Sequence, residues 1–118
     1  MRQQTNLLIT FFLITIPAIV LSQAPTTPAT NLTFSNIKGD RMDLDFNSGD
    51  GAKRIIIAKE GSSVTAVPTD GTDYLADEFG SGNEIATDEF VVYEGNDSDA
   101  TITGLNHSTT YYFKIFEF

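Results

Sequence analysis

The stretch "LNHSTTYYFKIFEF" (residues 105–118) has the clearest strand pattern in the chain. Its apolar side chains alternate with a period of two, which predicts a half-buried β-strand. The apolar pattern continues to Phe118 without a turn, so we expect this strand to have an unpaired edge. One face should carry Tyr111, Phe113 and Ile115, and the other Tyr112, Lys114 and Phe116.

Similar short strand patterns, separated by turns, occupy the rest of the chain. Residues 32–35 and 41–46 alternate apolar and polar side chains, and the second segment places Leu44 and Phe46 on its inner face. In "RIIIAKEG" (residues 54–61), three consecutive isoleucines predict a central strand that is buried on both faces. Further strands are expected at residues 64–67, 89–95 and 100–105, with glycine-rich turns at residues 47–53 and 79–85.

The N-terminus has the composition of a secretory signal peptide. Arg2 precedes an almost unbroken apolar run over residues 7–21, and Ser22 is a small residue at the expected cleavage site. At about 1.5 Å per residue the run is about 22 Å long, short of the bilayer's hydrocarbon core of about 30 Å. We therefore expect cleavage of residues 1–22, a Pro/Thr-rich lead-in over residues 23–30, and a protein that is secreted or on the cell surface. A retained membrane anchor is the alternative.

Charge and composition limit the partners and the fold. The chain has sixteen Asp and Glu against seven Lys and Arg, for a net charge of −9. Such acidity disfavours nucleic acids and anionic membrane surfaces as partners. No cysteine occurs, so an apolar core and hydrogen bonds must hold the fold without disulfides. The roughly 90 residues after the lead-in suit one all-β sandwich, because short strands and turns alternate throughout.

The segment "GLNHSTTYYFKI" (residues 104–115) resembles a strand corner of the fibronectin type III family. The resemblance implies an immunoglobulin-like, fibronectin type III β-sandwich over residues 31–118. It makes Leu105 the buried corner leucine and Tyr111 the corner tyrosine, whose hydroxyl bonds to an upstream backbone group. It also implies that the last strand of the family, strand G, is absent from this sequence.

The middle of the chain is similar to a variety of this domain found in secreted bacterial proteins. Residues 59–85 and the later "VVYEG" (residues 91–95) carry the similarity. Two positions depart from it: Phe46 stands near where many such domains have a core tryptophan, and His107 where the corner loop often has proline. The matching residues are Gly61, Val64, Pro68, Asp70, Gly71, Tyr74, Phe79, Gly80, Gly82, Val92, Tyr93 and Gly95.

No group of residues in the sequence predicts catalysis. His107 is the only histidine, and its neighbour Ser108 lacks the sequence context of a hydrolase nucleophile. Asp43 and Asp45 should lie about 7 Å apart on one strand, but on a solvated face without a cleft. We therefore predict no catalytic, cofactor-binding or metal-binding residue. Turn formation, rather than calcium binding, is the expected role of Asp50, Asp97 and Asp99.

Exposed aromatic side chains are the remaining functional feature. We expect Tyr112, Phe116 and Phe118 on the outward face of the last strand, with Tyr74 and Tyr93 near them as a possible interaction surface. The sequence thus predicts a non-catalytic extracellular spacer or protein-interaction module of a larger secreted or cell-surface protein. Its partners would be neighbouring domains or other extracellular proteins. Two alternatives remain: a carbohydrate-binding or adhesive module that binds glycans through these aromatics, and an accessory domain of a secreted enzyme whose catalytic part lies downstream.

Overall fold

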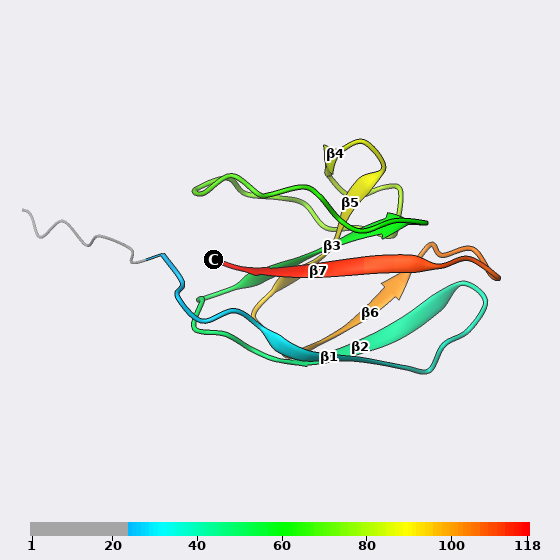
Figure 1. The fold of residues 1–118 in the computed structure, drawn as a ribbon, viewed down its shortest axis with the longest axis horizontal. Helices are drawn as coiled ribbons and strands as arrows, with labels where there is room; N and C mark the ends of the chain where they lie inside the picture. Colours follow the sequence, from blue (N-terminus) through cyan, green and yellow to red (C-terminus); the bar gives the residue numbers. More distant parts are fainter. Residues whose placement is uncertain (1–23) are drawn as a thin grey trace, which may run out of the picture.

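The computed structural model describes residues 24–118, so the expected signal peptide lies outside the described residues. The strands in this range form a three-stranded sheet, in the order β1-β2-β6, and a four-stranded sheet, in the order β4-β5-β3-β7 (Figure 1). All pairings are antiparallel, which confirms the predicted all-β class. Residues 24–118 contain no helix that is long and apolar enough to cross a bilayer. The strands are β1 (Thr30–Ser35), β2 (Arg41–Asn47), β3 (Arg54–Glu60), β4 (Glu84–Ala86), β5 (Glu89–Gly95), β6 (Asp99–Thr103) and β7 (Tyr111–Glu117).

The main apolar core lies between the two sheets. Leu44 is fully buried and Phe46 is 5% exposed on the inner face of β2, as their alternation with aspartates predicted. Burial of each such side chain stabilises the fold by about 1.5–3 kcal/mol, so this cluster accounts for much of the driving force. The other buried members are Ile56, Ala58, Val92, Ala100, Ile102 and Leu105.

The isoleucines of β3 are buried on both faces, as predicted, because β3 lies between β5 and β7. Ile56 points into the core between the sheets, whereas Ile55 and Ile57 point to the opposite face of the four-stranded sheet. Residues 61–83, an irregular segment, fold over that face (Figure 1). Val64, Ala66 and Tyr74 of this segment pack there with Val91 and Phe116 as a second apolar layer.

Two local predictions are wrong. Residues 64–67 do not form a strand, because the N–H groups of Thr65 and Ala66 donate to the carboxylate of Glu89 and not to a neighbouring strand. Conversely, part of the predicted glycine-rich turn at residues 79–85 belongs to β4, which pairs with the edge of β5. In both places the local structure depends on a contact with β5, which the local sequence pattern does not show.

Among residues 24–118, β7 is an edge strand, with β3 as its only neighbour in the sheet. Just beyond its last residue, the Phe118 N–H donates to the Lys53 carbonyl at 2.7 Å, and the Lys53 N–H donates back at 3.2 Å. Because hydrogen-bonding direction alternates along an antiparallel strand, the backbone groups of Tyr112, Lys114 and Phe116 also face β3. The backbone groups of Tyr111, Phe113, Ile115 and Glu117 therefore face the free edge.

Candidate functional site

A buried ion pair fixes the C-terminal end of β7. The Arg54 Nε and Glu117 Oε1 lie 3.0 Å apart, and the two side chains are 4% and 3% exposed. Glu117 also accepts the N–H groups of Gly49 and Gly51, at 2.8 and 3.1 Å. The Arg54 guanidinium donates to the carbonyl of Asp97 at 2.7 Å. Arg54 and Glu117 therefore bind only groups of the same chain in this cluster, and their role is to stabilise the fold.

A second buried carboxylate, Glu89, is also held by hydrogen bonds from the same chain. It is fully buried at the start of β5 and accepts hydrogen bonds from Lys59 Nζ, the Thr65 N–H and hydroxyl, and the Ala66 N–H. Burial alone would raise the pKa of Glu89, but these hydrogen bonds lower it to about 2. Glu89 therefore stays ionised and anchors residues 65 and 66 to the sheet. It has no proton to give or take near neutral pH.

Arg54, Glu89 and Glu117 were not predicted as buried charges from the sequence. A signal exists: each is a charged residue at the end of a mostly apolar strand, where a charge without a partner would be costly. What the sequence does not give is the partner. Arg54 and Glu117 are 63 positions apart, and Glu89 is 24 positions from Thr65.

Tyr111, the predicted corner tyrosine, is hydrogen-bonded to the turn that precedes β7. The Tyr111 hydroxyl accepts the N–H of Asn106 at 2.9 Å, five residues upstream. Its half-buried ring packs edge-on against Phe79, with ring centroids 4.9 Å apart. Leu105 is 7% exposed in the core between the sheets, where Phe113 and Ile115 also pack. These contacts hold the turn before β7.

The predicted aromatic strip is not a single exposed surface. Tyr112 is 41% exposed, but Phe116 and Phe118 are half-buried against the second apolar layer. The ring of Tyr74 packs against that of Phe118, with ring centroids 6.4 Å apart. Tyr93 lies elsewhere, against the core between the sheets. A register shift between Ile56 and Ile57 in the β3–β5 pairing turns Tyr93 to that side. The Tyr93 hydroxyl accepts the Asp97 N–H at 2.9 Å.

The polar candidates of the sequence analysis are held in local contacts. His107 is exposed, and no side chain hydrogen bond to its ring is present within residues 24–118. Hydrogen bonds from Asn36 and Thr101, both 2.7 Å, lower the pKa of Asp43. Hydrogen bonds from Thr27 and Thr26 lower the pKa of Asp50, which thereby fixes the lead-in. Across residues 24–118, no three His, Cys, Asp or Glu residues are grouped to hold a metal ion.

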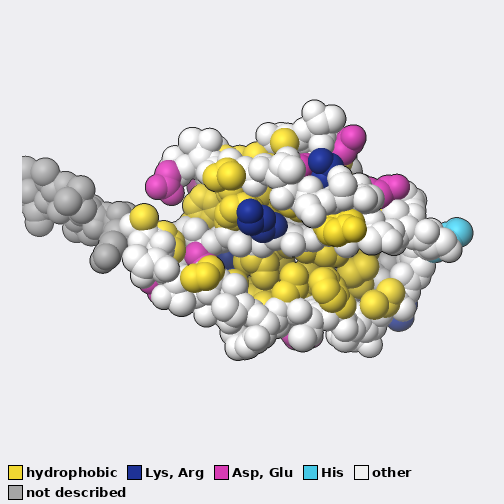
Figure 2. Space-filling view, in the orientation of Figure 1, with side chains coloured by type: hydrophobic (Ala, Val, Ile, Leu, Met, Phe, Trp, Pro, Cys, Tyr) yellow, Lys and Arg dark blue, Asp and Glu magenta, His cyan; other side chains and the backbone are white. Residues whose placement is uncertain are grey.

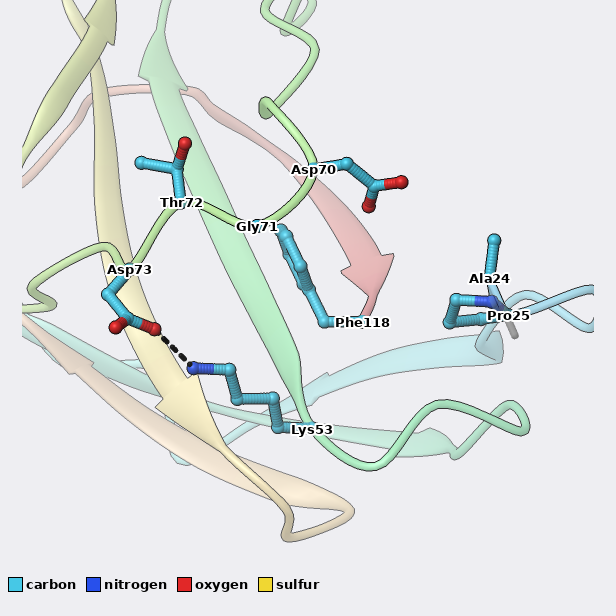
Figure 3. Close-up of a pocket in the computed structure, with 8 residues that line it drawn as sticks. All are labelled: Ala24, Pro25, Lys53, Asp70, Gly71, Thr72, Asp73 and Phe118. Atoms are coloured by element: carbon cyan, nitrogen blue, oxygen red, sulfur yellow. Dashed lines mark hydrogen bonds and ion pairs between the residues drawn. The ribbon is translucent and has the colours of Figure 1, made fainter. Parts of the chain in front are cut away.

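An open hollow of about 490 Å³ lies at the end of β7. Figure 3 shows the residues that line it. Phe118 and Gly71 both line the hollow, and the Lys53 Nζ lies 3.2 Å from an Asp73 carboxylate oxygen. Hydrogen bonds to Glu94 and Asp73 raise the pKa of Lys53. An aromatic ring beside hydroxyl, carboxylate and ammonium groups can contact a polar ring-shaped ligand. The other lining residues are Ala24, Pro25, Asp70 and Thr72.

A second, smaller hollow, here called the edge groove, lies between β1 and the free edge of β7. It has a volume of about 250 Å³ and is lined by residues 29–32 and residues 113–115. Phe34 is 48% exposed, and its ring centroid lies 5.7 Å from that of Phe113. Figure 2 shows hydrophobic side chains gathered along β7 and between it and the three-stranded sheet. The core between the sheets is therefore partly accessible along this side.

The chain matches no known family model and no curated protein.

Proposed function

We propose that this chain is a non-catalytic extracellular module of the fibronectin type III kind, acting as a spacer or protein-interaction domain of a larger secreted or cell-surface protein. The antiparallel three- and four-stranded sheets and the Tyr111–Asn106 corner bond support the fold type. The apolar signal-like segment at residues 7–21 supports secretion.

The hydrogen bonding of the buried polar side chains supports a non-catalytic role. No buried side-chain nitrogen or oxygen within residues 24–118 lacks a hydrogen-bond partner. Arg54, Glu89 and Glu117 are buried, but each is neutralised by an opposite charge from the same chain. Catalytic sites need an ionisable group poised toward a cleft, and these groups point into the packed protein.

The observation that carries the interaction role is the edge groove. Apolar side chains that remain accessible in a row beside an unpaired strand are typical of a surface that another protein covers. A photo-crosslinking amino acid at Tyr112, which is 41% exposed and precedes Phe113 on β7, should yield defined protein adducts when the protein is made in its native cells. The same group at Leu75, which is 74% exposed on residues 61–83, is the matched control. Equal labelling at the two positions, or none at either, would contradict an interaction role for this side.

A carbohydrate-binding or adhesive function is the second candidate, and the hollow beside Phe118 favours it. Its volume of about 490 Å³ falls within the range of small-ligand sites. A glycan array probed with the protein and with Phe118→Ala separates the two candidates. Glycan binding that Phe118→Ala abolishes would support this function, whereas an array without signal leaves the protein-interaction role as the better account.

A further inference from the structure

We propose that a pocket at the end of β3 binds the guanidinium group of an arginine side chain that another polypeptide presents. The pocket, here called the carboxylate pocket, has a volume of about 380 Å³, within the range of ligand sites. It shares no lining residue with the edge groove or with the hollow beside Phe118. The inference rests on the proposed protein-interaction function and adds a second surface to it. The lining residues are Glu60, Gly61, Phe79, Asp88 and Phe90.

Strand alternation places this pocket on the inner face of the four-stranded sheet. Glu60 follows Ile56 and Ala58 on β3 at intervals of two, so its side chain points to the same face as these core residues. Phe90 pairs with Ala58 and therefore points to that face as well. Ala58 is fully buried, whereas Glu60 is exposed. The pocket therefore begins where the core between the sheets ends.

Two half-buried aromatic rings form the apolar wall of the pocket. The ring of Phe79 packs edge-on against Phe90 and against Tyr111, with ring centroids 5.2 and 4.9 Å apart. The Phe79 N–H donates to the Thr103 carbonyl at 2.9 Å. Gly104 permits this close approach, because a Cβ there would lie 2.9 Å from the Phe79 nitrogen. The aromatic wall is therefore held in place, and aromatic rings attract cations.

Glu60 and Asp88 supply the charged groups of the pocket, and both are negative. Both residues are exposed, and neither takes part in an ion pair within the part of the chain that the structure describes. Lys59, the neighbour of Glu60, points to the opposite face of β3, where its Nζ lies 3.0 Å from a Glu89 carboxylate oxygen. The carboxylate pocket should therefore favour a cationic ligand.

A guanidinium group matches both parts of the pocket. Its plane can stack on an aromatic ring while its N–H groups donate to carboxylates, a combination that a compact ammonium group does not offer. Free arginine would bring its own carboxylate toward a protein with a net charge of −9, whereas an arginine within a polypeptide does not. The ligand is therefore an arginine side chain in a neutral or basic segment of another protein.

The test is the binding of two short peptides to the isotope-labelled protein, followed by NMR. Acetyl-Gly-Arg-Gly-amide should shift the amide signals of Gly61, Asp88 and Phe90 in a saturable way. Acetyl-Gly-citrulline-Gly-amide has nearly the same shape without the charge and should bind about tenfold more weakly. Equal binding of the two peptides, or no saturable shift at these three residues, would overturn a guanidinium site.

Removal of one carboxylate at a time tests the polar part of the pocket. Glu60→Gln and Asp88→Asn should each weaken binding of the arginine peptide about two- to fivefold. Asparagine tolerates the positive φ of 60° at position 88. Asp45→Asn removes an equal charge from an exposed position on β2, in the other sheet, and is the matched control. An equal loss in Asp45→Asn would show that net charge alone attracts the peptide, and would overturn the site.

A leucine substitution tests the aromatic wall. Phe90→Leu keeps an apolar side chain but removes the ring, and should weaken binding of the arginine peptide about two- to fivefold. Phe34→Leu removes an exposed ring on β1 and is the control. Unchanged binding in Phe90→Leu would overturn the contribution of the aromatic wall.

The two experiments separate this inference from the proposed function. Defined adducts at Tyr112 without binding of the arginine peptide would leave the proposed function standing and overturn the carboxylate pocket alone. Binding of the arginine peptide without adducts at Tyr112 would support the carboxylate pocket and count against the edge groove.

Discussion

Arg54 and Glu117 join the first residue of β3 to the last residue of β7 through a buried ion pair with an Nε–Oε1 distance of 3.0 Å. The carboxylate is held further by the N–H groups of Gly49 and Gly51. Because these contacts satisfy both charges, the end of β7 is held in place, although within residues 24–118 that strand pairs with β3 alone. Side-chain contacts therefore add to the β3 pairing at this end of β7.

Removal of one member of this pair should be strongly destabilising. Glu117→Gln leaves the Arg54 guanidinium buried without a counter-charge, so we expect a loss of about 3 kcal/mol or more in the free energy of unfolding. Urea denaturation followed by circular dichroism measures this loss. Arg41→Gln, which breaks the exposed Asp40–Arg41 pair, is the control and should leave the midpoint unchanged. Similar losses in the two variants would contradict the buried cluster.

The glycines next to Glu117 are required by close packing. A Cβ on Gly49 would overlap the carbonyl oxygen of Thr27 and lie 2.8 Å from Glu117 Cγ. Gly49→Ala should therefore cost about 1–3 kcal/mol in the free energy of unfolding. Gly39→Ala is the matched control, because its Cβ would meet only His107 Cβ at 3.5 Å, an ordinary contact. If thermal melts show the two variants to be equally stable, the close approach of the lead-in to this turn is wrong.

Stability should fall in acid partly through Glu89. The pKa of Glu89 is lowered to about 2 from the ordinary value of 4.5, chiefly by hydrogen bonds from Thr65 and Ala66 that outweigh burial. A lowered folded-state pKa means that the ionised group stabilises the fold above pH 4.5, and that this contribution is lost as the pH falls from 4.5 to 2. Unfolding free energies across this range should fall less steeply in Glu89→Gln.

The control for this pH dependence is Glu60→Gln, an exposed position on the same sheet. It should keep the slope of the unsubstituted protein. A slope in Glu89→Gln that also matches the unsubstituted protein would show that Glu89 does not titrate with folding.

The corner hydrogen bond gives a smaller, specific effect. Tyr111→Phe removes the hydroxyl that accepts the Asn106 N–H at 2.9 Å and should cost about 1 kcal/mol. Tyr112→Phe changes the neighbouring, exposed ring in the same way and should not alter the midpoint. Equal denaturation midpoints for Tyr111→Phe and the unsubstituted protein would reject the corner.

Much of the fold could be predicted from local patterns. The alternation at Leu44 and Phe46, and the isoleucine run of β3, each reflect burial that one strand's own periodicity reveals. The boundaries of β5 at residues 89–95 follow for the same reason. These features depend on the strand's own sequence and on burial against some apolar surface. They do not depend on which segment provides that surface.

The parts that could not be predicted depend on which distant segment lies alongside. Tyr93 faces the core because of a register shift in the β3–β5 pairing, which no alternation within residues 89–95 shows. Thr65 and Ala66 bind a carboxylate in place of a strand. Phe118 was expected on an exposed strip, but residues 61–83 fold back over that face and cover it in part. The candidate site lies where these long-range placements leave an edge uncovered.

The most direct test of the account is amide hydrogen exchange along β7, measured by NMR on the protein alone. The N–H groups of Lys114 and Phe116 face β3 and should be protected, whereas those of Phe113 and Ile115 face the free edge and should exchange rapidly. Alternating protection of this kind is the predicted result. Uniform protection of all four amides would show that another segment already covers β7 and would contradict an open edge.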